Sequence, residues 1–260
     1  MYKNNKEKLL SELLASINQH KMPPDVAHVE IHGNEVLGLH LVDGLFVESE
    51  SFDEGVKVKI IVRKDTTIKN PVCFCFGMIP ENGIQKIIIN TIIEENAHTS
   101  FLANCTFPNA KNIQHIMNAT ITLEKNSSLK YFERHIHGPE GGVTILPETK
   151  VFIKENASFS TEFELIKGAA GVINLSYHAI VEKNGTVEMK ARIFGRFNDS
   201  INIKESAHLI GESSIGVLTS HIALKDNASA KIENEIIADG AFARGHVDCK
   251  EIVQNNAKAK

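Results

Sequence analysis

The stretch VFIKENASFSTEF (residues 151–163) decides the fold of this chain. Apolar residues alternate up to Lys154, Asn156 and a small residue follow, and the alternation resumes at Phe159 and Phe163. Alternation with a period of two indicates a β-strand with one buried face. Asn tolerates left-handed backbone angles, so Asn followed by a small residue favours a tight corner between two strands.

The same unit recurs along the chain, in segments that begin at Ile92, Ile121, Val151, Ala179, Ile201, Ile222 and Glu251. Its corner residue, once Ser and otherwise Asn, falls at positions 96, 126, 156, 184, 206, 227 and 256, with spacings of 30, 30, 28, 22, 21 and 29. A unit of this size cannot bury its apolar face alone, but stacked copies can. The sequence therefore predicts an all-β fold, a β-helix whose coils are 21–30 residues long. The alternative is a β-sandwich, which evenly spaced strands also suit.

The N-terminal region differs from the repeats. Residues 6–19 place Leu10, Leu13, Leu14 and Ile17 at helical spacing, and two prolines end the run. Residues 26–90 alternate short strands with Gly and Asn turns. We therefore expect an N-terminal α-helix within residues 1–24 and one β-helix domain over 25–260. Its first coils and a cap would occupy 25–90, and its regular repeats 91–260.

Composition narrows the classes of function. A hydrophobic content of 42% with 23% charged residues is ordinary for a soluble globular protein, and a formal charge of −4 argues against a nucleic-acid partner. The first twenty residues lack a continuous apolar run, so we expect neither a signal peptide nor a membrane span. Four cysteines are too few and too irregular for a disulfide framework. These features predict a cytoplasmic protein with free thiols.

Three stretches carry a resemblance to a known family: HIHGPEGGVTILPETKVFIKENASF (135–159), FELIKGAAGVINLSYHAIVEKN (163–184) and ARGHVDCKEIVQNNAKAK (243–260). Together with the stacked units, they resemble the SufB/SufD family, the scaffold proteins of the Suf iron–sulfur cluster assembly system. The resemblance covers roughly residues 85–260. It implies a right-handed parallel β-helix that pairs with a like subunit through its last coils, as a homodimer or a SufB/SufD-type heterodimer. It also implies a SufC-like ABC-type ATPase partner and a transient iron–sulfur cluster.

The resemblance also assigns a thiol. In the family the critical cysteine lies in the last β-helical coil near the subunit interface, and the run GHVDCKEIVQ makes that position Cys249. Family members continue into a helical segment that carries the main ATPase contact, whereas this sequence stops at Lys260. We therefore expect a short form, in which binding of the ATPase is in question.

The GHVDC stretch offers three types of metal ligand within four residues. Thiolate is a natural ligand of iron in a sulfide cluster, and the imidazole of His246 and the carboxylate of Asp248 could fill other positions. In a regular strand, however, Cys249 faces one side while His246 and Asp248 face the other. All three could bind one cluster only at a bulge or turn, or if two subunits contribute. The residues alone favour a buried core cysteine, and the resemblance favours Cys249 as a ligand.

Other candidate ligands are weaker. Cys73 and Cys75 share one strand face and could hold a metal or persulfide sulfur, but their apolar neighbours favour packing. His135 and His137 also share a face, and a solvated face is favoured over a metal site. Cys105 is expected in the core or a turn.

Three functions compete on this evidence: a cluster-assembly scaffold, a polysaccharide-active β-helix enzyme and a purely structural solenoid. The enzyme is disfavoured because the chain has no Trp and only three Tyr for sugar platforms, and its acids cluster at corners. No G-x-x-x-x-G-K-[ST] phosphate loop occurs, so any ATP hydrolysis belongs to a partner. We therefore predict a non-catalytic scaffold.

Overall fold

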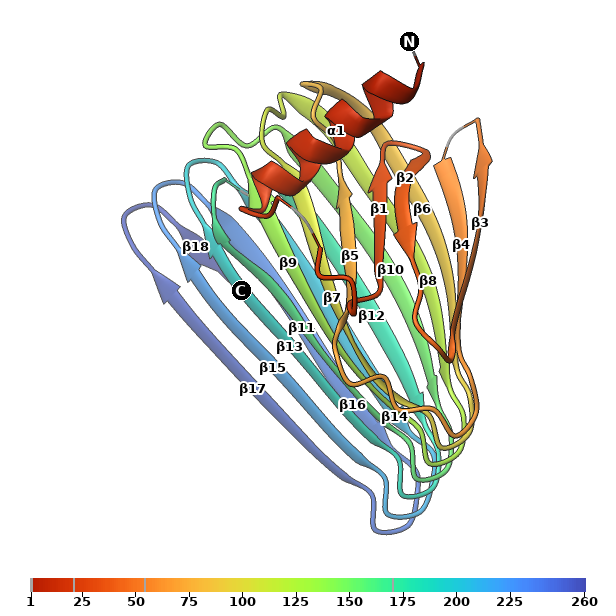
Figure 1. Ribbon diagram of the computed structural model, residues 1–260. Coiled ribbons are helices and arrows are strands. Elements are labelled where there is room, and N and C mark those ends of the chain that lie inside the picture. The colour runs from red at the N-terminus through yellow and green to blue at the C-terminus, as the bar shows by residue number, and fades with distance from the viewer. Residues whose placement is uncertain (1, 21, 54, 170) are drawn as a thin grey trace.

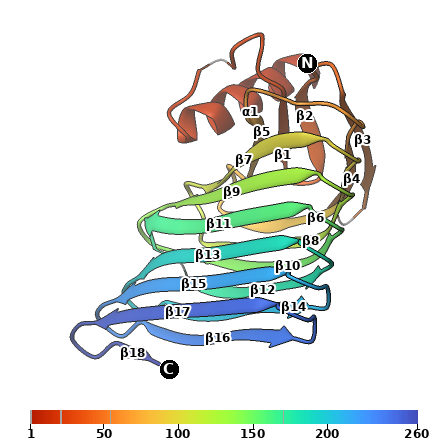
Figure 2. The ribbon, with the colours of Figure 1, turned by 90° about the horizontal axis from the view of Figure 1, so that it is seen from below.

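The computed structural model describes residues 2–20, 22–53, 55–169 and 171–260. Its strands stack in parallel coils and form a β-solenoid, with one helix at the N-terminal end (Figures 1 and 2). Each coil contributes one strand to each of two nine-stranded sheets, and the strands β4 to β17 make seven coils at two strands per coil. The predicted β-helix architecture is confirmed, and the β-sandwich alternative is not what forms.

The two sheets are defined by their strands. The first sheet contains β1 (His28–His32), β2 (Glu35–His40), β5 (Val72–Gly77), β7 (His98–Phe107), β9 (Ser128–His137), β11 (Ser158–Lys167), β13 (Thr186–Gly195), β15 (Ile215–Leu224) and β17 (Arg244–Val253). The second sheet contains β3 (Leu45–Phe52), β4 (Gly55–Val62), β6 (Asn82–Ile93), β8 (Asn112–Leu123), β10 (Val143–Ile153), β12 (Val172–Val181), β14 (Ser200–Leu209), β16 (Ser229–Ala238) and β18 (Lys258–Ala259).

The regular coils stack in register, with a nearly constant length. Phe159 lies beside Leu129 of the preceding coil and Val187 of the following one, which makes those two coils 30 and 28 residues long. Gly216 in turn lies beside Val187 and Gly245, at 29 residues each. A constant length keeps inward-facing side chains above one another from coil to coil.

One corner of the solenoid is built on a column of residues with positive φ, which follow successive strands of the second sheet: Asp65, Asn96, Asn126, Asn156, Asn184, Ser213 and Phe242. Neighbouring Asn side chains in this column bond to one another. The Asn156 amide donates to Asn126 Oδ1 at 3.1 Å and accepts from Asn184 at 3.0 Å. The Asn corners predicted at 96, 126, 156 and 184 are therefore confirmed.

The two short predicted spacings, 22 and 21, do not measure coils. Ser206 lies inside β14, whereas Asn227 and Asn256 follow β15 and β17 at the opposite corner. That opposite corner has its own residues with positive φ: Phe197, Asp226 and Asn255. The two corners use similar Lys- and Asn-containing sequences, and this similarity made them look like one column.

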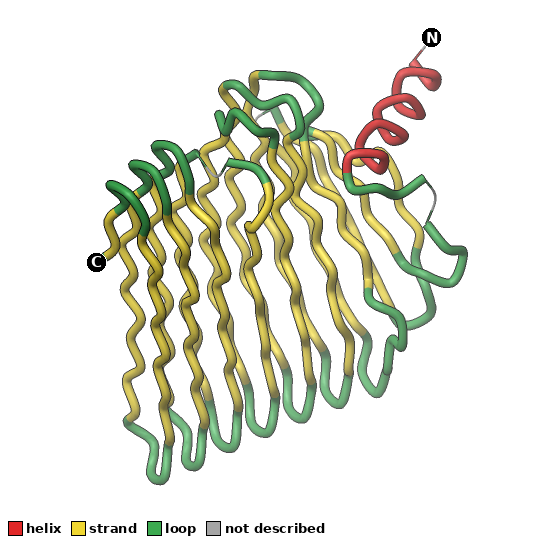
Figure 3. Tube along the Cα trace, turned by 90° about the vertical axis from the view of Figure 1, so that its left-hand side faces the viewer, coloured by secondary structure: helices red, strands yellow, loops and turns green. Residues whose placement is uncertain are grey.

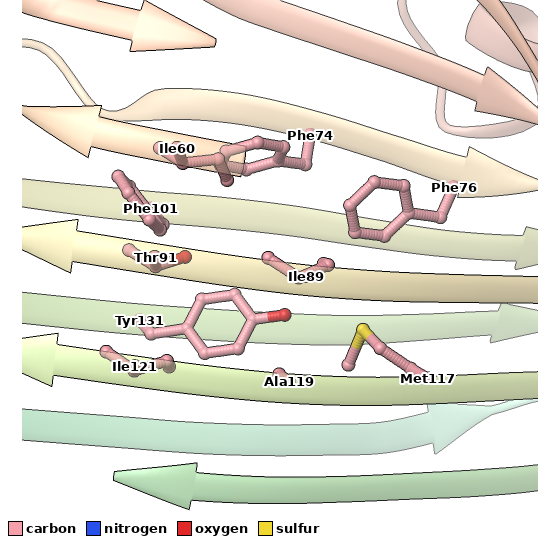
Figure 4. A pocket seen from close by; sticks show the side chains of 10 residues that line it. All are labelled: Ile60, Phe74, Phe76, Ile89, Thr91, Phe101, Met117, Ala119, Ile121 and Tyr131. Atoms are coloured by element: carbon pink, nitrogen blue, oxygen red, sulfur yellow. The ribbon is translucent and has the colours of Figure 1, made fainter. Parts of the chain in front are cut away.

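The core fills the space between the sheets. Inward positions alternate with outward ones along each strand, as in β13, where Val187, Met189, Ala191 and Ile193 are all buried. Phe74, Phe101 and Tyr131 stack on successive coils and line an apolar cavity of ≈ 20 Å³ (Figure 4). That is room for about one water molecule in an apolar setting.

The N-terminal end of the solenoid is covered. Helix α1 (Tyr2–Ser16) lies beside this end in Figure 3 and packs Leu14, together with Leu10 and Ile17, near Cys73 on β5. The predicted helix is thus present, although it ends three residues earlier than expected. Strands β2 and β3 run antiparallel to β1 and β4 and form the outer edges of the two sheets. No helix among the described residues is long and apolar enough to cross a membrane.

The C-terminal end is open within the described residues. Strand β17 pairs with β15 on one side, and no described strand pairs with its other side. Apolar side chains gather here with large exposed areas, including Phe242 at 80% and Ile252 at 71%. The two ends of the solenoid therefore differ: one is covered, and the other presents an unpaired strand and apolar side chains.

The Asn column yields a stability prediction. Asn156→Gly should lower the free energy of unfolding by about 1 kcal/mol, because it keeps the positive φ but removes two exposed side-chain hydrogen bonds. Asn156→Ala should cost about 2–3 kcal/mol, because it also places a Cβ in the left-handed region. Urea denaturation followed by circular dichroism measures both values. If Asn156→Ala is as stable as Asn156→Gly, the φ of 58° at this corner carries no strain.

Candidate functional site

The predicted ligands of the GHVDC stretch all lie on β17, the last long strand of the solenoid. Cys249 is in register with Ser220, which is buried and faces the interior. His246 and Asp248 are in register with Val217 and Thr219, on the outer face of β15. The strand is regular here, so one chain does not bring the three side chains together. The expected separation of Cys249 from His246 and Asp248 is confirmed.

The Cys249 thiol lies at the open end of the interior. Asn234, which reaches across from β16 in the opposite sheet, donates to Ser220 Oγ at 2.9 Å and to Cys249 Sγ at 3.4 Å. Cys249 itself is exposed. Partial burial raises the pKa of its thiol, the carboxylate of Glu251 adds to this effect, and the bond from Asn234 opposes it. Cys249 is thus an accessible thiol held in place by an amide.

A buried carboxyl group lies one coil behind this thiol. Glu205 on β14 is in register with Asn234 and is 1% exposed. Its Oε2 has no hydrogen-bond partner among the described residues. Burial raises the pKa of Glu205 to about 8, and the hydrogen bond from Ser220 opposes the shift only weakly. The group therefore holds a proton at neutral pH behind the Cys249–Asn234 pair.

Outside the solenoid, Asp248 is engaged by two basic side chains. Lys250 Nζ lies 2.9 Å from its Oδ2, and His221 Nε2 lies 3.3 Å away. These two hydrogen bonds lower the pKa of Asp248, so it is a carboxylate at neutral pH. His246 is exposed nearby on the same face. Both residues face solvent, where a second chain could reach them.

The first pair of weaker candidates lies far from β17. Cys73 and Cys75 are on β5 at the N-terminal end, and both are buried. They alternate with the inward-facing Phe74 and Phe76, so they face outward, and Leu14 and Met22 cover Cys73. Burial raises the pKa of both thiols, that of Cys75 far above its ordinary value. They share one strand face as predicted, in an apolar contact with α1.

The second pair is where the interpretation was wrong. His135 and His137 do not line a solvated face: they are 1% and 6% exposed and point into the solenoid. The strand sequence SLKYFERHIH contains the signal that was overlooked. Leu129 and Tyr131 face inward, so period-two alternation carries Glu133, His135 and His137 inward as well. Chemical type was allowed to outweigh periodicity.

The inward-facing residues of β9 make a buried polar cluster with a thiol from β7. His135 Nε2 lies 2.8 Å from Glu133 Oε1, Tyr177 donates to Glu133 Oε2 at 3.1 Å, and Cys105 Sγ lies 3.9 Å from Glu133 Oε1. Burial acts to raise the pKa of Glu133, but the hydrogen bond and charge of His135 outweigh it and hold that pKa below its ordinary value.

Two expectations changed in this cluster. Cys105 was expected in the core or a turn, and it is in the core, but with polar neighbours. Glu133 was not a sequence candidate at all. Cys105, Glu133 and His135 offer one sulfur, one oxygen and one nitrogen donor within 4.8 Å of one another. A donor set of this kind can hold a metal ion.

Comparison with known proteins gives two close relatives, while no family model matches the chain. The chain is 30% identical over 260 residues to an iron–sulfur cluster assembly SufBD family protein of Methanocaldococcus jannaschii, covering 98% of the chain and 82% of that protein. It is 32% identical over 232 residues to a protein of the same description from Pyrococcus horikoshii, covering 89% of the chain and 71% of that protein.

The Glu205 carboxyl group predicts a pH dependence of stability. Between its ordinary pKa of 4.5 and about 8, the unfolded chain releases this proton while the folded chain keeps it. Folding is therefore destabilised as pH rises through this window, by about 1.4 kcal/mol per pH unit, and the loss levels off above it. Glu205→Gln should remove the loss, so its advantage over the native chain should grow from pH 5 to 8.

Unfolding free energies measured by urea denaturation at several pH values test this prediction. Glu235→Gln, an exposed change on β16, is the matched control and should run parallel to the native chain. A Glu205→Gln curve that also runs parallel to the native one would show that Glu205 is ionised in the folded protein.

Proposed function

Because the chain belongs to the SufBD family of iron–sulfur cluster assembly proteins, we propose that it is a non-catalytic scaffold subunit for iron–sulfur cluster assembly. In this role the Cys249 thiol binds iron of a nascent cluster at the open end of the solenoid. The cluster is cargo that the scaffold later releases. Thiolate is the usual protein ligand of such clusters.

The accessibility of Cys249 carries this proposal. A thiol that receives iron and sulfide and then gives up a cluster has to be reachable from outside. Among the described cysteines, Cys249 is exposed, while Cys73, Cys75 and Cys105 are buried. The Asn234 amide fixes the Sγ position without blocking it. The same coil carries the family resemblance in GHVDC.

A second chain would complete the ligand set. One exposed thiol cannot hold a cluster that is normally bound by about four protein ligands. The unpaired edge of β17 and the exposed apolar side chains near it favour association, since such edges and patches attract a partner. In a symmetric pair joined at the last coils, each chain would present its Cys249 to the seam, and His246 or Asp248 of one chain could approach the thiol of the other. The second chain is a copy of this one or a SufB/SufD-type relative.

Energy for assembly would come from a partner. The sequence has no phosphate-binding loop, so a SufC-like ABC-type ATPase is the proposed source of ATP hydrolysis. The scaffold then has two tasks that its residues can perform: it offers a thiol at an assembly surface and binds other subunits. A structural solenoid without cluster chemistry is the alternative that the first experiment separates.

Anaerobic reconstitution with iron(II) and sulfide tests the thiol. The native chain should gain a visible absorption of a sulfide-bridged iron cluster, and Cys249→Ser should lose most of it because oxygen replaces the sulfur ligand. Cys73→Ser, which changes a buried thiol at the other end of the solenoid, is the control and should keep the absorption. Equal absorption in Cys249→Ser and the native chain would remove Cys249 from the site. No absorption in any chain would favour the purely structural role.

The pairing of last coils has its own test. Val247→Asp places a charge among the exposed apolar side chains of the open end, and it should lower the dimer fraction about tenfold or more at a fixed concentration. Sedimentation velocity measures this fraction. Ile84→Asp, at an apolar side chain of β6 that is 57% exposed, is the control and should leave association unchanged. A native chain that remains monomeric at high micromolar concentration would contradict pairing between copies.

A further inference from the structure

The buried cluster on β7 and β9 is separate from Cys249 and is not used by the proposed assembly site. Cys105 and His135 are register partners on neighbouring strands, so their side chains lie side by side in the interior. Glu133 is two residues before His135 on the same strand face. Stacking of coils thus brings a thiol, a carboxylate and an imidazole to one point, and all three residues are at most 1% exposed.

From this geometry we propose that Cys105, Glu133 and His135 bind one divalent first-row transition-metal ion, iron(II) or zinc, inside the solenoid. The donor atoms already lie within 4.8 Å of one another. Bonds of about 2.0–2.3 Å in a tetrahedral site separate donor atoms by about 3.3–3.8 Å. Small side-chain adjustments would therefore close the three ligands around an ion. Mixed sulfur, nitrogen and oxygen donors suit iron and zinc better than calcium or magnesium.

The hydrogen bonds around His135 prepare it as a ligand. His137 Nδ1 lies 3.0 Å from the Ala169 carbonyl oxygen, which can only accept, so His137 Nδ1 carries the proton. Burial lowers the pKa of His137 to about 3, so its Nε2 is a lone pair facing His135 Nδ1 at 3.4 Å. His135 then donates through Nδ1 and directs Nε2 toward Glu133 and Cys105. Metal-binding histidines commonly have their other ring nitrogen held in this way.

A fourth donor faces the same region. His115 on β8, in the opposite sheet, is fully buried, and neither of its ring nitrogens has a hydrogen-bond partner among the described residues. Its ring centroid lies 5.9 Å from that of His135. A buried imidazole without partners is costly, and coordination would satisfy it. This observation is independent of the three-residue group and points to a ligand in the same place.

Charge balance also favours an ion here. A divalent cation bound by one thiolate and one carboxylate, with neutral imidazoles, makes a site of zero net charge. Burial of such a site avoids the large cost of isolated charge in an apolar interior. Binding replaces the proton of the Cys105 thiol and the proton shared by His135 and Glu133, and both protons leave to solvent.

Cobalt(II) is a spectroscopic probe for this site. The experiment uses the full chain carrying Cys249→Ser, so that the exposed thiol does not contribute, and supplies cobalt(II) anaerobically both to folded protein and during refolding from urea. We expect about one cobalt per chain, with a near-ultraviolet thiolate-to-metal absorption and an increase in Tm. Competition with iron(II) and with zinc then tells which ion displaces the probe more readily.

Variants assign the ligands. Adding Cys105→Ser should abolish the thiolate absorption and the Tm increase, while Glu133→Gln and His135→Gln should each weaken binding at least tenfold. Cys75→Ser, a buried thiol on the outward face of the neighbouring strand, is the matched control and should bind as before. Circular dichroism checks that each variant folds, and the cobalt-dependent Tm increase is read within each variant.

Two results would overturn the proposal: an absence of bound cobalt in both loading conditions, or a thiolate absorption that survives Cys105→Ser. The result is independent of the assembly role. Cys105→Ser alone should keep the visible absorption of the reconstituted cluster, and Cys249→Ser should keep the buried metal, so failure of one site does not imply failure of the other.

Discussion

The structure depends on the register between coils. A single coil of about 29 residues has two strands and two corners and cannot bury its own inward side chains, so each inward row needs a coil above and below it. Parallel strand pairing holds the coils together, and the Asn column at one corner repeats the same bond from coil to coil. Residues 28 to 30 apart in sequence therefore become neighbours in space, whatever their chemistry.

This rule explains how far the sequence could predict the fold and the sites. The alternating strands and the Asn corners were readable because one residue type repeated in one structural role. The opposite corner was not, because Phe197, Asp226 and Asn255 share a backbone angle but no side-chain type. The buried cluster was missed for a related reason: Cys105 and His135 are 30 residues apart, and only a correct coil length places them side by side. Separation of Cys249 from His246 and Asp248 required only strand alternation, and it was predicted.

Two buried carboxyl groups show how neighbours decide the charge of the interior. Burial opposes ionisation in both. Glu133 has His135 and Tyr177 as hydrogen-bond donors, and its pKa is held below the ordinary value. Glu205 has little more than Ser220, and its pKa rises to about 8. The interior is thus divided: the coils around β9 stabilise negative charge, and those near the open end disfavour it.

The two thiols that face the interior differ in the same respect. Cys105 is surrounded by side chains that can hold a bound cation and keep solvent away, which suits retention. Cys249 has an amide bond, an uncovered side and a neighbouring unpaired strand, which suits exchange with a partner. A ligand that has to release its cargo cannot lie in a closed, charge-balanced pocket, because release would leave charges buried without partners. Position along the solenoid, rather than the cysteine itself, therefore separates a site that can hold a metal from one that can pass it on.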